Sequence, residues 1–256
     1  MKGIVMIAVL VGLAASPASA GLIDGLEGYW PFEDVAQPGK DESGNGRDGS
    51  LVGTVAREGG GGVVGAAMRF NNHVGDEVDA TGHTMPATNA ITLSAWVNHD
   101  QWDGATTERY VVMPSEVAVI RRQWDRSAHF FIKTDGTVRH LLGSKLFDNS
   151  WYHIVGTWDG TTQKLYVNGS SISATPPGTL DPINDGAAIS WAGGEGMDGR
   201  LDEVAIWSRA LEQAEIDVLW NSGAGTSLLP LINVVPEPAG LSLLGLALLA
   251  VRKRRS

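Results

Sequence analysis

Apolar and polar residues alternate in short runs between Gly25 and Gly225, which is the pattern of half-buried β-strands. In the segment AITLSAWVN, one side of the predicted strand carries Ile91, Leu93, Ala95 and Val97. Further strands are predicted near residues 151–158, 163–167 and 170–174. Asp159-Gly160 and Asn168-Gly169 lie between them, and both pairs favour the tight turns of hairpins.

One segment has a helical pattern, from Leu211 to Trp220, with Glu212 early in it and Gly223 just beyond its end. No repeat or long linker divides the roughly 200 residues that contain the strands and this helix, a length that suits one large sandwich or barrel. The pattern therefore predicts a single all-β domain with one short C-terminal helix.

The first twenty residues have the three parts of a signal peptide. Lys2 supplies the positive charge, Ile4 to Ala14 the apolar stretch, and ASPASA the small-residue cleavage site before Gly21. A membrane anchor is the alternative, but the apolar run is short and small residues follow it. The chain has no cysteine, so the exported fold must be held by a large core, a metal ion or both.

The other end carries a second apolar segment, Ala239 to Val251, followed by Arg252, Lys253, Arg254 and Arg255. Thirteen helical residues span only about 20 Å of a hydrocarbon core that is roughly 30 Å thick, so the segment would anchor weakly. The basic end should stay cytoplasmic. Pro236 and Pro238 stop a helix from extending upstream.

This end resembles the PEP-CTERM sorting signal, with Pro236, Glu237 and Pro238 as its motif, then a short transmembrane helix and a basic terminus. The resemblance implies a Gram-negative host and an exosortase as transient partner. It also implies an inner-membrane anchor before processing, and the cell surface or extracellular matrix afterwards. The expected layout is a signal peptide (1–20), a domain (21–225), a linker (226–235) and a sorting signal (236–256) with a transmembrane helix at 239–251.

The charge excludes one class of partner. The chain holds 19 basic and 29 acidic residues, for a net charge of −10, and without the basic residues of both ends it reaches about −15. Nucleic acid needs clustered Lys and Arg, so it is not an expected partner. Cations and neutral polymers suit an acidic exported domain.

Six segments occur in the order found in LamG-like domains: GYWPFED, DESGNGRDG, AAMRFNN, ITLSAWVN, WYHIVGTWDGTTQKLYVNG and GRLDEVAIWSRALEQAEIDVLW. The resemblance covers most of residues 25–222. It implies a concanavalin A-like jelly roll, in which two antiparallel sheets stack. Most members of this fold are binding modules, but the same sandwich also hosts glycosidases.

A calcium site is predicted from two places. Asp41, Asn45 and Asp48 offer oxygen ligands on a glycine-rich loop, although the same residues also mark ordinary surface turns. In RLDEVAIW, alternation places Asp202 on one strand face with Val204 and Ile206, where a carboxylate needs compensation. LamG-like domains commonly hold a structural calcium with such loops.

We therefore expect a Ca²⁺ site that includes Asp41, Asn45 and Asp202, with Asp48 and Glu203 as further ligands. Arg200 or backbone amides satisfying Asp202 remain the alternative.

Eight of the nine tryptophans divide into two groups by position, and the ninth, Trp220, ends the predicted helix. Those within predicted strands are expected in the core: Trp30, Trp96, Trp151, Trp158 and Trp207. Those in or beside irregular segments are the candidates for stacking on sugars: Trp102, Trp124 and Trp191. The stretch 98–110 is the expected ligand loop.

No catalytic site is expected. Glucanases of this fold often use E-x-D-x-x-E, and in EIDVLW the second glutamate is replaced by Trp220. The sequence predicts an exported, calcium-stabilised module that binds a polysaccharide or glycoconjugate. A matrix or adhesion protein that binds no sugar is the alternative, and a glycoside hydrolase is the third hypothesis.

Overall fold

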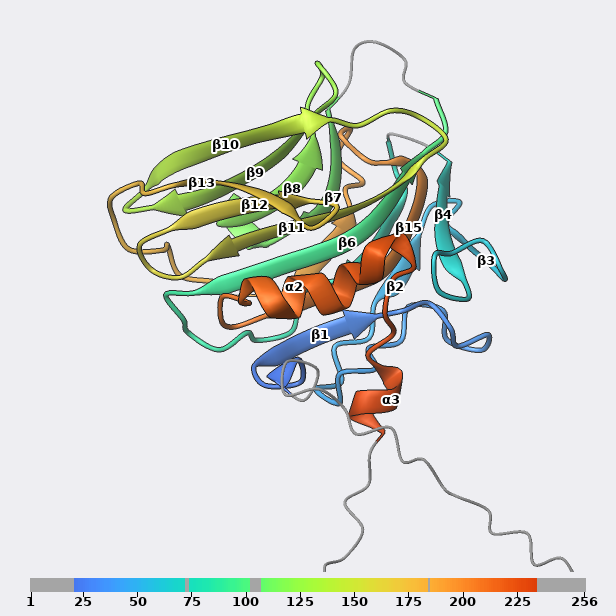
Figure 1. The fold of residues 1–256 in the computed structure, drawn as a ribbon. Helices are drawn as coiled ribbons and strands as arrows, with labels where there is room; N and C mark the ends of the chain where they lie inside the picture. The colour runs from blue at the N-terminus through green and yellow to red at the C-terminus, as the bar shows by residue number, and fades with distance from the viewer. Residues whose placement is uncertain (1–20, 72–73, 102–106, 184, 234–256) are drawn as a thin grey trace, which may run out of the picture.

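The computed structural model describes residues 21–71, 74–101, 107–183 and 185–233, which form two stacked sheets (Figure 1). The strands are β1 (Leu26–Trp30), β2 (Ser50–Val52), β3 (Ala56–Glu58), β4 (Ala67–Asn71), β5 (Glu77–Ala80), β6 (Ile91–His99), β7 (Glu108–Val112), β8 (Ala118–Arg122), β9 (Ser127–Thr134), β10 (Thr137–Lys145), β11 (Trp151–Trp158), β12 (Gln163–Val167), β13 (Ser170–Ala174), β14 (Ala187–Ser190) and β15 (Asp198–Trp207). The helices are α2 (Gln213–Trp220) and α3 (Leu229–Ile232), with short 3-10 turns at Pro114–Glu116 and Asn221–Gly223.

One sheet has eight strands in the order β13-β12-β11-β6-β15-β4-β3, with β1 also paired to β15. The other has seven, in the order β10-β9-β8-β7-β14-β5-β2. Paired strands run antiparallel in both sheets. The predicted all-β sandwich is thus confirmed, and the strands expected near 151–158, 163–167 and 170–174 are β11, β12 and β13.

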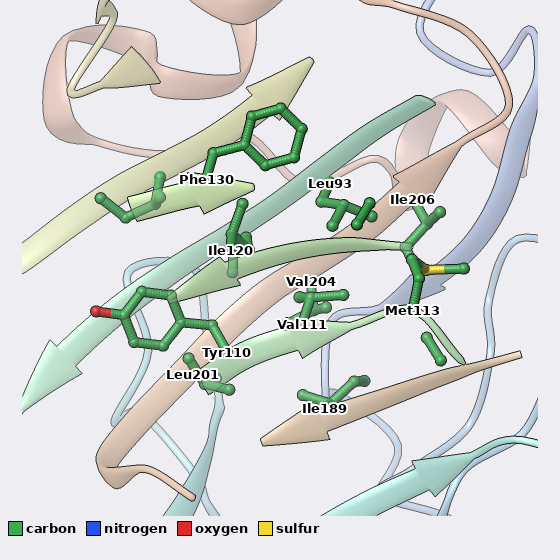
Figure 2. Close-up of a cluster of buried hydrophobic side chains, with 14 of the residues drawn as sticks. Leu93, Tyr110, Val111, Met113, Ile120, Phe130, Ile189, Leu201, Val204 and Ile206 are labelled. Carbon is green, nitrogen blue, oxygen red and sulfur yellow. The ribbon is translucent and has the colours of Figure 1, made fainter. Parts of the chain in front are cut away.

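The core lies between the sheets. Figure 2 shows side chains of β7, β8 and β9 meeting those of β6 and β15. The predicted inner side of β6 is confirmed, since Ile91, Leu93, Ala95 and Val97 are all buried there. Gly156 marks the close approach of the two sheets, because a Cβ at this position would overlap the ring of Phe130. Of the tryptophans expected in the core, Trp151 is half-buried and the others are buried.

A second apolar cluster lies on the opposite side of the eight-stranded sheet. There α2 lies along the sheet (Figure 1) and packs Ile216 and Leu219 against Trp207. The helix begins at Gln213, two residues later than predicted, because Glu212 and Glu215 form a capping box at its N-terminus.

The segment after this helix also packs on the sheet. Leu228 is buried, and its backbone N–H donates to the Tyr29 hydroxyl at 3.0 Å. Residues 226–233, expected to be part of a linker, therefore belong to the folded domain.

Strand β15 departs from the predicted alternation. Its register shifts between Asp202 and Ala205, and Glu203 has a φ of 49°. This bulge places Leu201 in the inner core together with Val204 and Ile206. The prediction that Asp202 shares a face with Val204 and Ile206 was wrong, because the extra residue at the bulge reverses the alternation and pairs Asp202 with Trp96, which points away from the inner core.

The two predicted export signals lie at the ends of the chain, outside the described residues. Residues 1–20, the motif Pro236-Glu237-Pro238 and the helix expected at 239–251 all lie outside the described residues. Within the described ranges, no helix has the length and apolar character needed to cross a membrane.

Candidate functional site

The loop that begins at Asp41 is held together by its own hydrogen bonds. The buried carboxylate of Asp41 accepts the N–H groups of Tyr29, Ser43 and Arg47, each at 2.9 Å. Asn45 donates its amide to the carbonyl of Leu26, and Asp48 accepts the N–H of Asp41. Asp41 and Asn45 tie the loop to β1, and Asp48 closes the loop on Asp41, as the turn interpretation expects.

Asp202 and Glu203 lie elsewhere, at the bulge of β15. Asp202 accepts the N–H groups of Val64 and Glu203, at 2.9 and 2.8 Å. Backbone amides therefore satisfy Asp202, while Arg200 pairs with Glu58 and Asp100.

Burial raises the pKa of both carboxyl groups at the bulge. The pKa of Asp202 rises to about 7 and that of Glu203 to about 9, and the charge of Asp202 adds to the shift of Glu203. Glu203 accepts a bond from the Tyr29 hydroxyl, but its Oε1 is buried without a hydrogen-bond partner. Both carboxyls are thus poorly solvated.

The five predicted ligands do not form one metal site. Across residues 21–71, 74–101, 107–183 and 185–233, no three His, Cys, Asp or Glu side chains are grouped to hold a metal ion. A smaller oxygen-rich arrangement exists at the glycine turn 62–65. Glu33 accepts the N–H of Ala66 at 2.8 Å there, and Asp202 accepts that of Val64. A Cβ on Gly62 or Gly65 would collide with one of these carboxylates, so only glycine permits their approach.

Burial is the main cause of the raised pKa of Asp202, and the charge of Glu33 adds to it. Two carboxylates at one backbone turn suit Ca²⁺, which binds carboxylate and carbonyl oxygens. Glu33 was not predicted as a ligand, although it lies in the motif GYWPFED.

The tryptophans predicted to bind ligand have different surroundings. Trp102 lies outside the described residues. Trp124 is 63% exposed in the turn between β8 and β9. Trp191 follows β14 and is half-buried against an apolar patch on the outer face of the seven-stranded sheet.

Along each strand, residues on this outer face alternate with residues that point into the core. In β8 and β9, Ile120 and Phe130 point inward, so their neighbours Val119, Arg121 and Phe131 point outward. The floor of the patch consists of four buried residues, Val112, Val119, Phe131 and Ala188. Long polar side chains and Trp191 cover this floor.

A hollow of about 130 Å³ opens beside Trp191. It is lined by Thr81, Val112, Met113, Pro114, Ser115, Glu116, Ala188 and Trp191. Ser115 and Glu116 both have a φ of 55°, a strained conformation for residues other than glycine, and such strain is frequent at ligand sites.

Arg109 organises the polar groups at the hollow. Its guanidinium lies 5.3 Å from the centre of the Trp191 ring and pairs with the carboxylates of Glu116 and Glu195. Its backbone N–H also donates to the Glu195 carbonyl at 2.8 Å, which fixes the loop that carries Trp191. The side chains of Glu116 and Glu195 remain 46% and 38% exposed, so both carboxylates can accept hydrogen bonds from a ligand.

Further across the same face, Arg121 donates to His129 at 2.9 Å, and His129 bonds His140 at 3.0 Å. Arg121 also lies 5.0 Å from the Phe131 ring centre. Burial lowers the pKa of His129 to about 3, and the charge of Arg121 adds to the shift. The result is a strip of aromatic rings, guanidinium groups and carboxylates.

The sequence reading found Trp191 but missed Arg109, Arg121, His129 and His140. A signal for the first three exists in ERYVV, AVIRR and SAHFFIKT, where basic residues stand among apolar ones inside strands, and His140 lies in the neighbouring strand TVRHLLGSK. A pattern of this kind marks an outer sheet face that carries polar side chains.

Fold and site together define a β-sandwich whose outer sheet face carries a small polar and aromatic hollow. The model of the concanavalin A-like lectin/glucanase superfamily matches residues 72–217, more than half of the chain, so the protein belongs to that superfamily. The predicted family is confirmed.

Solved structures with the same fold share little sequence with this chain. Domain 4 of a GH43 extracellular arabinanase from Geobacillus stearothermophilus, in complex with arabinotriose, is 20% identical with a TM-score of 0.60, over 78% of this chain and 98% of that one. The receptor-binding domain of botulinum neurotoxin type G is 12% identical with a TM-score of 0.61, over 77% and 51%. At these identities the likeness shows the fold alone.

Mouse pappalysin-1 is 27% identical over 73 residues, which are 26% of this chain and 4% of the relative. The chain thus spans a small fraction of that relative's length.

The depressed pKa of His129 predicts a loss of stability in mild acid. Unfolded histidine titrates near 6.5, so between about pH 6.5 and 3 the unfolded chain takes up a proton that folded His129 does not. The free energy of unfolding should therefore fall as the pH falls through this range. His129→Gln can accept from Arg121 and donate to His140 without titrating, and it should lose less stability between pH 7 and 5 in denaturant titrations. An equal loss in both proteins would contradict the assignment.

Proposed function

We propose that the protein is an exported glycan-binding module whose ligand contacts the outer face of the seven-stranded sheet at Trp191. The observation that carries the proposal is the hollow beside Trp191, where an aromatic ring, an apolar floor and the half-exposed carboxylate of Glu116 meet. A second half-exposed carboxylate, that of Glu195, is held nearby by the same guanidinium of Arg109. Sugar rings have an apolar face and a rim of hydroxyl groups. Trp191 and Val112 suit the apolar face, and Glu116 and Glu195 suit the hydroxyls.

The size of the hollow favours a small unit of the ligand. Pockets for drug-sized ligands measure about 300–1,000 Å³, so about 130 Å³ suits a single sugar ring of a longer chain. Arg109 holds both carboxylates and the loop of Trp191, which reduces the ordering that binding requires. The arabinotriose complex of the similar arabinanase domain supports a glycan ligand.

The module acts without catalysis in this proposal. Glycosidases need one carboxyl group protonated as the acid and another ionised. Glu116 and Glu195 are both paired with the same guanidinium, that of Arg109. The segment EIDVLW, weighed above as a degraded glucanase motif, forms most of α2, and its Glu215 pairs with Arg209.

Export by the N-terminal signal and processing by an exosortase at Pro236–Pro238 complete the proposal. The intact mass of the protein recovered outside the cell tests processing, and a mass that still includes Arg252 to Arg255 would contradict it.

Removing the Trp191 ring should weaken glycan binding at least tenfold, because truncating a central aromatic contact commonly costs 2 kcal/mol or more. The measurement is titration calorimetry of the purified protein with the glycans that it retains from a panel that includes arabinotriose and arabinan. Trp124→Ala is the matched control, since it removes an exposed ring far from the hollow and should leave the affinity for a short oligosaccharide unchanged. Unchanged binding by Trp191→Ala, or no binding to any glycan, would refute the proposal.

Calcium is the proposed cofactor, held by Asp202 and Glu33 at the glycine turn and not by the loop of Asp41, Asn45 and Asp48. A cation there would compensate the buried carboxylate of Asp202, whose raised pKa is due mainly to burial, with a contribution from the charge of Glu33. The bound ion would supply positive charge and fix the glycine turn 62–65 against β15.

Calcium should raise the melting temperature of the protein by about 5–10 °C. A ligand at a hundredfold excess over its Kd stabilises the folded state by about 2.7 kcal/mol, and each kcal/mol shifts the midpoint of a domain of this size by roughly 2–4 °C. Asp202→Asn should abolish most of this gain, whereas Asp48→Asn should retain it. Melting curves with calcium, magnesium and chelator provide the test, and superimposable curves would exclude the site.

A further inference from the structure

The outer face of the seven-stranded sheet has two chemically different ends. Trp191 follows β14, and His140 lies on β10. The order β10-β9-β8-β7-β14 separates these strands by four spacings, about 19 Å at 4.7–4.9 Å each. A glycan chain that occupies the hollow at Trp191 and crosses the strands would therefore place another part of its length over His140.

Hydrogen bonds at the His140 end run in one direction. Arg121 has only donors, so its bond to His129 Nδ1 makes that nitrogen an acceptor. The proton of neutral His129 is then on Nε2, which donates to Nδ1 of His140. Neutral His140 must in turn carry its proton on Nε2. No described residue accepts a hydrogen bond from this nitrogen, and His140 is exposed.

Acidic groups near this end already have partners. Asp125, whose charge acts on His129, bonds Lys145 and Ser127. Glu195 pairs with Arg109 and also lies 3.7 Å from the guanidinium of Arg121. The donor that remains for a ligand at the His140 end is therefore Nε2–H of His140, whereas the Trp191 end presents the acceptors Glu116 and Glu195.

We propose that the glycan bound at Trp191 is an acidic one, and that a carboxylate of a neighbouring uronic acid residue accepts a hydrogen bond from Nε2 of His140 beside Arg121. This inference rests on the glycan-binding function proposed above. A hydroxyl can donate as well as accept, whereas a carboxylate only accepts, so a site of donors selects the carboxylate. The net negative charge of the protein repels polyanions in general, and selectivity for carboxylates then depends on this local set of donors.

The experiment compares acidic polysaccharides with their carboxyl-reduced counterparts, in which each carboxylate has become a hydroxymethyl group. Polygalacturonate, alginate and hyaluronan are the probes, and the full purified protein is used. The wild type should bind at least one acidic polymer roughly 10- to 100-fold more tightly than its reduced form, the range expected for one charged hydrogen bond.

Two variants of His140 separate the donor role from a structural one. His140→Gln can accept from His129 and donate outward through its amide, so it should keep most of the preference for the acidic form. His140→Leu should lose the preference while it stays folded and still binds the reduced polymer.

This inference is overturned if binding depends on Trp191 but does not distinguish acidic from reduced polymers. It is also overturned if His140→Leu keeps the full preference for the acidic polymer. Either result leaves the glycan-binding function standing. Binding to no polysaccharide of either form, or binding unaffected by Trp191→Ala, contradicts the function itself.

Discussion

Strand β15 is buried on both faces, and the rest of the fold is arranged around this constraint. Its inner face contributes Val204 and Ile206 to the core between the sheets, and its outer face contributes Ala205 and Trp207 to the cluster under α2. The apolar ring of Trp207 is kept from water by α2, α3 and the segment at Leu22, which all pack on this sheet. The Trp207 indole donates a hydrogen bond to the Leu22 carbonyl at 2.7 Å. The eight-stranded sheet is therefore closed to ligands over this area, and the opposite sheet keeps the open face.

The bulge in β15 explains where the buried carboxyls lie. An extra residue at Asp202–Glu203 lets Asp202 reach the N–H groups of a neighbouring turn while Val204 and Ile206 keep their places in the core. Sequence alternation alone predicted that Asp202 shares the core face with Val204 and Ile206. It could not predict the bulge, because a shift in register depends on the partner strands and leaves no mark in the local pattern.

Local sequence patterns report interactions between residues close in sequence. They therefore predicted the fold elements well and failed for the site. The hairpins β11–β12–β13 follow from Asp-Gly and Asn-Gly turns, and α2 follows from its spacing and cap, so each depends on residues close in sequence. The site at Trp191 joins Arg109, Glu116 and Glu195 from three separate segments. Those contacts depend on the order of strands β8-β7-β14 in the sheet, which the sequence pattern does not specify. Asp41 shows the reverse case, since its loop looked like a metal site but is satisfied by its own amides.

The central claim is that the glycan contacts the outer sheet face at Trp191. Among the tryptophans, Trp158 and Trp207 are fully buried and serve as internal references, whereas Trp191 borders the hollow. Indole N–H resonances of the nine tryptophans, assigned by single replacements and followed during titration with a bound oligosaccharide, give the most direct measurement. The account predicts that the Trp191 resonance shifts with the same Kd as calorimetry while those of Trp158 and Trp207 stay in place. A titration in which Trp191 does not move and other indoles do would contradict it.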